Sequence, residues 1–334
     1  MPFRMRKILL QYLSVLILAG GLAACHSGSQ SGSSSASGTS QSLTLSPAPA
    51  FNADSAYAWV ARQVAFGPRI PNTPAQLKCA DWLISKMKQF ADSVTVQRTQ
   101  VTGPAGQSLR CINIIGHFNP QAKTRILILA HWDTRPFADG NPATKTQHFD
   151  GADDGGSGVG VILEIARQMH LKHPDVGVDL LLTDAEDYGV DGNDNSWGLG
   201  TQYWARQAVA GGYKAEYGIL LDMVGGKGAH FYREYMTKHY ADAPSRMLWN
   251  VANQIGYSDY FRYDNLGNAG ITDDHVFVNQ IAHIPTMDII ALGADGSFMP
   301  WHHTLADNMK VIDTSTLKAV GQTVLQVIYS NPPY

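Results

Sequence analysis

Four short apolar segments of the chain have the composition of strands buried on both faces, and they constrain the fold more than any other feature. They are residues 125–130 (RILILA), 178–183 (VDLLLT), 218–222 (GILLD) and 284–291 (IPTMDIIA). Continuous apolar runs of this length are typical of a parallel sheet covered by helices on both faces. Stretches with helical spacing of apolar residues separate them, such as residues 159–170 (VGVILEIARQMH). The alternation predicts an α/β domain with a mostly parallel, mixed central β-sheet flanked by helices.

Length and composition are compatible with one such domain. The chain has 334 residues, of which 44% are hydrophobic and 16% charged, so it is neither a disordered chain nor a small disulfide-stapled one. Lys and Arg together number 25 against 28 Asp and Glu, a net charge of -3 that gives no support to a nucleic-acid-binding scaffold. No internal repeat and no second low-complexity linker interrupts the pattern. We therefore expect residues 44–334 to form a single domain.

The first 25 residues have the features of a secretory signal. A basic start with Arg4, Arg6 and Lys7 precedes an apolar stretch, and small residues lead directly into Cys25. This arrangement resembles a bacterial lipobox, which predicts a lipoprotein signal peptide over residues 1–25, with Cys25 carrying the lipid. An ordinary signal cut at the same small residues, or an uncleaved anchor, is the alternative.

Residues 26–43 are nearly all Ser, Gly, Gln and Thr and are predicted to be a flexible tether, because they cannot bury apolar surface. Together with the signal, the tether predicts an exported protein, a periplasmic or outer-membrane-anchored lipoprotein of a bacterium. Its only contact with the membrane would be the lipid anchor. The two remaining cysteines, Cys79 and Cys111, could form a disulfide in that compartment or remain as two buried thiols.

Acidic residues and histidines follow the predicted strands, where the ligand sites of such sheets lie. These segments are HWD at 131–133, GADDGGSG at 151–158, DAED at 184–187, Asp222 and WHHTLADN at 301–308. Each alone is ordinary, because Asp before Gly is usually a turn or a helix cap and a loop His is usually a surface residue. Together they crowd carboxylates that repel one another unless a cation or shared protons compensate. Asp and His ligands suit zinc with an open coordination position.

The order HxD, GADDGGSG, DAED, LLD, DDH and HHT resembles the zinc-dependent M28 peptidase family over almost the whole chain from about residue 51. Within it the chain is most similar to glutaminyl cyclases of the bacterial group that shares the animal-type fold. The stretches HWDTRPFAD, DAEDYG, WGLGTQYWA and FYREYMTKHYA carry that closer resemblance. It implies a zinc aminopeptidase-like, phosphorylase/hydrolase-like fold, and GADDGGSG alone would mark only the wider family.

The resemblance also implies roles for individual residues. One zinc ion per chain would bind Asp154, Asp187 and His303, with Asp187 in place of the more common Glu. Glu186 would be the proton shuttle. Asp222 and Asp273 would complete an acidic network beside it, and Asp274 is a close rival to Asp273 one position along the chain.

The implied reaction converts the N-terminal glutamine of a peptide or protein to pyroglutamate and releases ammonia. The substrate's own α-amine attacks the side-chain amide, so the protein needs a metal and a base but no nucleophile. Three aromatic residues flank the motif loops as possible walls of a glutamine pocket, or as ordinary loop anchors: Trp197, Phe298 and Trp301. Peptides with N-terminal glutamine are therefore the expected partners of a monomer that binds no nucleic acid.

Two other functions are compatible with the same residues. In a co-catalytic zinc aminopeptidase, His131 and Asp222 would bind a second metal ion, Asp154 would bridge, and Glu186 would activate water. In a non-enzymatic lipoprotein that only binds peptide N-termini, the Glu186→Gln substitution would leave binding unchanged. A pure binder has no need for both a base and a full ligand set.

Overall fold

The structure is a computed structural model that describes residues 43–264, 266 and 270–334. The predicted signal peptide, the lipidated Cys25 and almost all of the predicted tether lie outside the described residues. No described helix is both long enough and apolar enough to span a bilayer.

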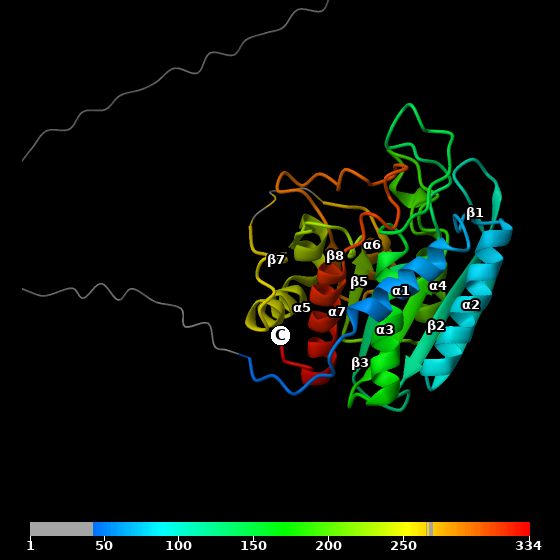
Figure 1. Ribbon diagram of the computed structural model, residues 1–334. Coiled ribbons are helices and arrows are strands. Elements are labelled where there is room, and N and C mark those ends of the chain that lie inside the picture. The colour runs from blue at the N-terminus through cyan, green and yellow to red at the C-terminus, as the bar shows by residue number, and fades with distance from the viewer. Residues whose placement is uncertain (1–42, 265, 267–269) are drawn as a thin grey trace, which may run out of the picture. The chain divides into compact units, whose positions relative to one another are not determined.

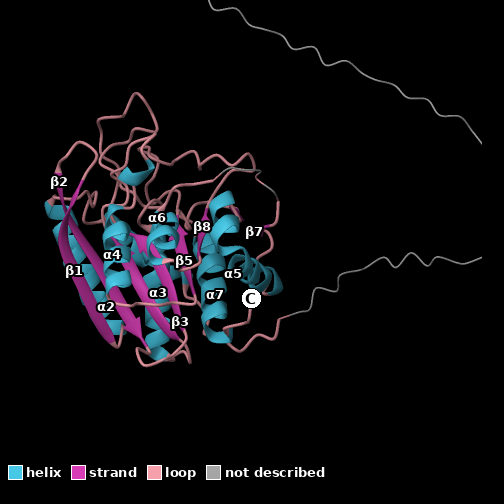
Figure 2. Ribbon diagram, turned by 180° about the vertical axis from the view of Figure 1, so that it is seen from behind, coloured by secondary structure: helices cyan, strands magenta, loops and turns pink. Residues whose placement is uncertain are grey.

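The centre of the described part is a six-stranded mixed sheet with the order β1-β2-β4-β3-β5-β8 (Figures 1 and 2). The strands are β1 (Ser93–Thr102), β2 (Ser108–Phe118), β3 (Arg125–His131), β4 (Gly177–Thr183), β5 (Tyr217–Asp222) and β8 (Thr286–Ile290). β1 pairs antiparallel with β2 and β2 with β4, whereas the pairings of β3 with β4, β3 with β5 and β5 with β8 are parallel. The predicted fold class is confirmed.

The side chains of the central strands alternate between two apolar layers, as the two-residue period of a strand requires. In β3, Ile126 and Ile128 face one layer, whereas Leu127 and Leu129 face the other. The first layer contains α1 (Ala53–Val64), α2 (Pro74–Phe90), α3 (Ser157–Leu171) and α7 (Thr314–Ser330). The second contains α4 (Leu199–Ala210) and the short η2 (Val278–Ala282), which follows α6 (Asp274–Phe277). Figure 1 shows α1, α3 and α7 packed side by side on the same face.

The two-stranded sheet of β6 (Phe231–Tyr232) and β7 (Phe261–Arg262) and the helix α5 (Tyr235–Gln254) lie beside the β8 edge. The single turn η1 (Asp194–Ser196) belongs to the β4–α4 loop. The sequence predicts only residues 246–255 of α5 as helix. The structure begins it eleven residues earlier, and the non-helical Ala241 and the internal Pro244 kink it. These two positions break the apolar periodicity on which the prediction depended.

Local signals in the sequence explain the element boundaries that were predicted well. The sequence predicts a helix over residues 74–90 that Thr73 opens with Pro74 in its first turn, and α2 has these bounds. Thr73 caps it by accepting from the Gln76 amide. Cys79 on α2 and Cys111 on β2 are both free and buried, so the open question of a disulfide is settled in favour of two thiols. Burial raises the pKa of Cys79 to about 12, which keeps that thiol protonated and inert.

The four strands β3, β4, β5 and β8 run parallel, so their carboxyl ends meet at one edge of the sheet. The segments that were singled out for their acidic and histidine residues therefore converge there.

Candidate active site

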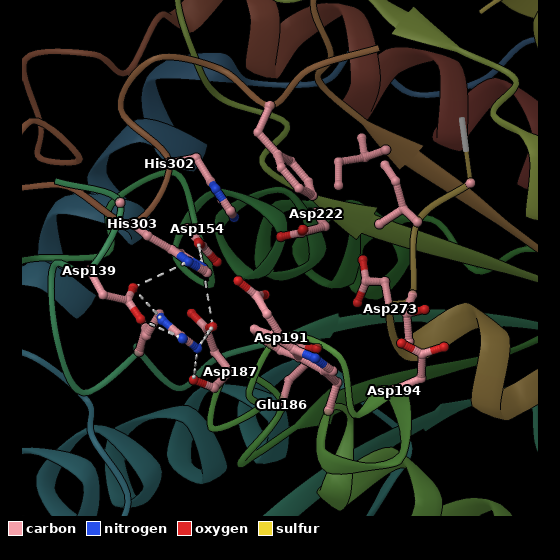
Figure 3. Close-up of a pocket in the computed structure, with 18 of the residues that line it drawn as sticks. Asp139, Asp154, Glu186, Asp187, Asp191, Asp194, Asp222, Asp273, His302 and His303 are labelled. Atoms are coloured by element: carbon pink, nitrogen blue, oxygen red, sulfur yellow. Dashed lines mark hydrogen bonds and ion pairs between the residues drawn. The ribbon is translucent and has the colours of Figure 1, made fainter. Parts of the chain in front are cut away.

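The carboxyl edge of the sheet opens into a cavity of about 500 Å³ (Figure 3). Its lining includes every predicted catalytic and metal-binding residue, namely Asp154, Glu186, Asp187, Asp222, Asp273 and His303. These residues come from five separate segments of the chain. Their convergence is what the placement of motifs after successive strands predicted.

The Nε2 atom of His303 lies between two carboxylates. It is 3.3 Å from Asp154 Oδ2 and 3.2 Å from Asp187 Oδ1, and both carboxylates are buried. Burial alone would lower the pKa of His303, but the negative charge of Asp187 and hydrogen bonding to Asp154 and Asp187 raise it to about 10. The two predicted carboxylate ligands thus both lie beside one nitrogen of the predicted histidine ligand.

Asp154 is held in place from behind by a residue far along the chain. The carboxylate of Asp307 accepts hydrogen bonds from the backbone N–H groups of Asp153 at 2.7 Å and Asp154 at 3.2 Å. The Asp153 side chain turns the other way and accepts from the Gly225 amide at 2.8 Å. These hydrogen bonds fix the GADD segment just before α3, so that Asp154 faces the cavity and Asp153 faces the protein interior.

The loop after β4 is fixed in a similar way. Asp133, which follows β3, accepts from the backbone N–H groups of Glu186 at 3.1 Å and Asp187 at 3.3 Å. Ala185 sits in the left-handed region with a φ of 56°, a conformation that non-glycine residues rarely adopt. The strained turn and the Asp133 anchor together direct both carboxylates into the cavity.

Glu186 is 7% exposed and surrounded by other acids. Burial first, and then the negative charge of Asp273, raise the pKa of Glu186 well above its ordinary value, while His131 acts in the opposite sense. A carboxyl group with a raised pKa can both accept and return a proton near neutral pH. This is the electrostatic setting that a proton shuttle requires.

Asp273 and Asp274 lie at the start of α6, and the structure distinguishes them. Asp273 lines the cavity, and its Oδ2 atom, like the Oδ1 atom of Asp274, is buried with no hydrogen-bond partner among the described residues. Asp274 instead accepts a hydrogen bond of 2.6 Å from the Thr183 hydroxyl inside the fold. Of the two rivals, Asp273 is the one placed to meet a ligand.

A second group of potential ligands lies next to the first. His131 Nε2 is 3.0 Å from Asp154 Oδ1 and 3.3 Å from Asp222 Oδ1. These three side chains offer ligand atoms within 4.8 Å of one another, as do Asp154, His302 and His303. The residues that a co-catalytic aminopeptidase would use are therefore also assembled, so geometry alone does not separate the two reactions.

The three aromatic candidates occupy different positions. Trp197 lines the cavity and stacks on His303, with ring centroids 6.4 Å apart, and Phe298 lines it with 41% of its surface exposed. Trp301 donates a hydrogen bond of 2.8 Å from its Nε1 atom to Asp153 and is not among the cavity-lining residues in the described part of the chain. Its position is that of a loop anchor, the alternative role considered for it.

Sequence reasoning missed several residues that shape the site. His302 stacks between Phe298 and His303, with centroids at 4.1 Å and 3.6 Å, and burial, followed by the charge of His303, lowers its pKa to about 3. Arg135 bonds Asp139 at 2.6 Å and lies over the Trp197 ring at 5.0 Å. Because Arg135 follows the HWD segment, the sequence indicates that it could pair with a carboxylate of the acidic cluster, and the structure shows that pair with Asp187 at 3.4 Å. The contact with Asp139 had no such signal.

A third cluster lies buried behind Asp273, and the sequence assigned it no role, although His275 belongs to the DDH motif and Glu234 to the FYREYMTKHYA stretch. His275 lies 3.5 Å from Glu234 and 3.9 Å from Asp288, and all three side chains are fully buried. In residues 43–264, 266 and 270–334, no hydrogen-bond partner is found for either nitrogen of His275 or either carboxylate oxygen of Asp288. The cluster extends the acidic network from the cavity wall into the core.

The donor set fits a divalent metal ion. Asp154, Asp187 and His303 supply oxygen and nitrogen atoms of the kind that zinc prefers, and the Oδ2 atom of Asp187 is buried without a hydrogen-bond partner. A bound cation would satisfy that atom and relieve the repulsion between the carboxylates.

Comparisons with known proteins agree with this geometry. The model of peptidase family M28 matches residues 113–328. The glutaminyl cyclase of Bacteroides thetaiotaomicron is 44% identical in sequence, with a TM-score of 0.82 over 85% of this chain and 99% of that one. The glutaminyl cyclase of Tannerella forsythia is 47% identical, with a TM-score of 0.80 over 84% and 99%.

Other relatives have peptidase names. A Zn-dependent exopeptidase from Parabacteroides distasonis is 48% identical, with a TM-score of 0.79 over 85% of this chain and 99% of that one. Aminopeptidase YwaD of Bacillus subtilis is 26% identical over 227 residues, which are 65% of this chain and 44% of YwaD, so the match spans less than half of that relative. The family and its Zn-dependent members imply zinc at this site. The chain belongs to peptidase family M28, and its close structural neighbours there, at 44% to 48% identity, include bacterial glutaminyl cyclases.

Proposed function

We propose that the protein is a glutaminyl-peptide cyclotransferase, which converts the N-terminal glutamine of peptides and proteins to pyroglutamate with release of ammonia. The observation that carries this proposal is the position of Glu186, a buried carboxyl group with a raised pKa next to the Asp154–Asp187–His303 set in one cavity. Identity of 44% to 48% to bacterial glutaminyl cyclases supports it.

The proposed metal site consists of Asp154, Asp187 and His303 with a single zinc ion. When bound, zinc supplies a Lewis acid that polarises the side-chain carbonyl of the substrate glutamine. The proximity of Asp154 and Asp187 to one nitrogen of His303 supports this ligand set.

The chain's own groups would then move the protons. The α-nitrogen of the substrate attacks the side-chain amide carbon, so a nitrogen–carbon bond forms within the substrate and the bond to the amide nitrogen breaks. Glu186 takes the proton that the α-amine loses and gives it to the departing nitrogen, which leaves as ammonia. Asp273, whose Oδ2 atom has no hydrogen-bond partner among the described residues, would accept a hydrogen bond from the α-amine of the substrate. Asp222 would complete the acidic network. Trp197 and Phe298 would enclose the glutamine side chain and limit access of water.

The experiment that tests this proposal follows a Gln-initiated peptide with the mature protein by mass spectrometry, together with an ammonia assay. Loss of ammonia with every peptide bond intact is the expected result. Release of free glutamine would instead support the aminopeptidase, a second candidate favoured by the His131–Asp154–Asp222 group.

For the rest of the chain, we propose the arrangement expected from the sequence: a lipoprotein signal over residues 1–25, a tether over 26–43 and one catalytic domain over 44–334, acting as a monomer. Labelling with a fatty-acid analogue in a bacterial host, with Cys25→Ala as the control, tests the lipid at Cys25. Size-exclusion chromatography with light scattering tests the monomer.

A further inference from the structure

The cavity is lined by far more negative than positive groups. Its acidic lining residues are Asp139, Asp154, Glu186, Asp187, Asp191, Asp194, Asp222 and Asp273, and Arg135 is the only Lys or Arg among the described residues that line it. Figure 3 shows most of these carboxylates directed toward the same space. A concave wall with one sign of charge concentrates ligands of the opposite sign.

Most of these acids already have a compensating partner or are deeply buried. Asp139 pairs with Arg135, and Asp154 and Asp187 contact His303. The others that are buried, Glu186, Asp222 and Asp273, belong to the acidic network of the proposed reaction. Two acids remain, Asp191 and Asp194. Both are exposed, and no ion pair joins either of them to a base within the described ranges.

The segment that carries these two acids is tied to the reaction centre. The Ser196 hydroxyl accepts from the Val190 amide at 2.9 Å, and the Gln202 side chain donates to the Trp197 carbonyl at 2.8 Å. Trp197 ends the segment and stacks on His303. Asp191 and Asp194 therefore have a fixed place at the cavity wall, beside the aromatic ring next to the proposed metal.

A separate observation points to a ligand that donates hydrogen bonds. Asp273 is 4% exposed and lines the same cavity, and within the described part of the chain its Oδ2 atom has no hydrogen-bond partner. In the proposed reaction Asp273 binds the α-amine of the first substrate residue. Asp191 and Asp194 are then available to bind groups further along the peptide. Phe298, 41% exposed at the cavity, offers an apolar surface for an aliphatic stem.

We propose that Asp191 and Asp194 determine specificity, by favouring peptides in which a lysine or arginine directly follows the N-terminal glutamine. The inference rests on the proposed cyclase function and names its substrate class. Because both acids are exposed, the preference is modest. We expect kcat/KM for a Gln-Lys peptide to exceed that for the matched Gln-Glu peptide about tenfold at low salt.

The test compares three peptides of equal length that differ only at the second residue, which is Lys, Gln or Glu. In the double variant Asp191→Asn/Asp194→Asn, the Lys-to-Glu ratio of kcat/KM should fall to about two or less. The matched control, Asp175→Asn/Asp259→Asn, removes the same charge from exposed positions outside the cavity and should keep the wild-type ratio. Raising the ionic strength should lower the ratio for the wild type but not for the double variant.

A wild-type ratio near one, or a ratio that the double variant leaves unchanged, would overturn the inference. If the double variant does not fold, the two single variants and the salt dependence of the wild type decide. If no peptide yields pyroglutamate, the proposed function fails instead. Titration calorimetry of the Gln-Lys and Gln-Glu peptides on the wild type and the double variant then tests the charge preference without turnover.

Discussion

Asp307 and Asp153 are 154 positions apart in the chain, yet the Asp307 carboxylate accepts a hydrogen bond of 2.7 Å from the Asp153 backbone N–H. The same carboxylate accepts from the Asp154 amide. Asp154, which faces the cavity, is thus held in place by Asp307, which is not among the described residues that line the cavity. Two buried backbone donors depend on one side chain.

We predict that Asp307→Ala destabilises the protein and weakens zinc binding. The substitution leaves two buried N–H groups without acceptors, each at a cost of about 1–3 kcal/mol, and frees Asp154 to move. Urea unfolding and metal analysis of the purified variant measure the two effects. Asp259→Ala, at an exposed position, should behave as the wild type. Unchanged zinc affinity in Asp307→Ala would contradict the positioning role.

Glu186→Gln should lower kcat for pyroglutamate formation by about 10²- to 10⁴-fold, the usual contribution of a general acid–base group. Glutamine has nearly the same shape but cannot carry the proton, so folding and zinc content should stay as in the wild type. Initial rates with a Gln-initiated peptide provide the measurement. The control is Glu216→Gln, at an exposed position on the polypeptide just before β5. Residual activity within tenfold of the wild type would exclude Glu186 as the shuttle.

Metal removal separates the two candidate reactions. We expect one zinc ion per chain, loss of activity on dialysis against a chelator, and recovery on addition of one equivalent of zinc. Asp187→Ala and His303→Ala should each abolish binding, whereas His148→Ala, at an exposed loop position, should keep the metal. Plasma emission spectrometry gives the stoichiometry. Two ions per chain, one of them lost in His131→Ala, would favour the co-catalytic aminopeptidase.

Asp288→Asn should leave the stability of the protein nearly unchanged near pH 4 and should stabilise it increasingly as the pH rises from there. Burial first, and then the charges of Asp273, Asp222 and Glu234, raise the pKa of Asp288 well above its ordinary value. The folded protein therefore keeps this proton in a range where the unfolded chain, with a pKa of about 4, has lost it.

The sign follows from that difference. The Asp288 carboxyl group makes the free energy of unfolding fall as the pH rises from about 4 toward the folded-state pKa, by up to about 1.4 kcal/mol per pH unit. Asn removes this dependence, so the difference in melting temperature between variant and wild type should grow between pH 5 and pH 8. Scanning calorimetry at both values tests it, and a constant difference would show that Asp288 carries no such shift.

The two tryptophans should respond differently to substitution. Trp197→Ala removes a cavity wall beside His303 and should raise KM several-fold with little loss of stability. Trp301→Phe keeps an aromatic ring but removes the donor to Asp153, at a cost in unfolding free energy of about 1–3 kcal/mol. Steady-state kinetics and urea unfolding on both variants separate the roles. An equal rise of KM in the two variants would indicate that Trp301 binds the substrate, as Trp197 is expected to do.

The strands and most helices of this protein could be predicted because their signals are local. The run RILILA at residues 125–130 specifies a buried strand wherever it lies, and Thr73 with Pro74 specifies the start of α2. The predicted α5 was too short, because Ala241 and Pro244 interrupt the helical period while packing keeps the helix in place. A local pattern cannot report a stabilisation that comes from neighbouring elements.

The sequence by itself determined the fold class and the group of acids and histidines at the strand ends, because chain order and burial place them at one edge of the sheet. Only the tertiary structure decided which of them meet. It directs Asp273 to the cavity and Asp274 to Thr183, ties Trp301 to Asp153, and buries the Glu234–His275–Asp288 cluster. These contacts join residues far apart in the chain, and their geometry depends on how whole elements pack rather than on any local pattern.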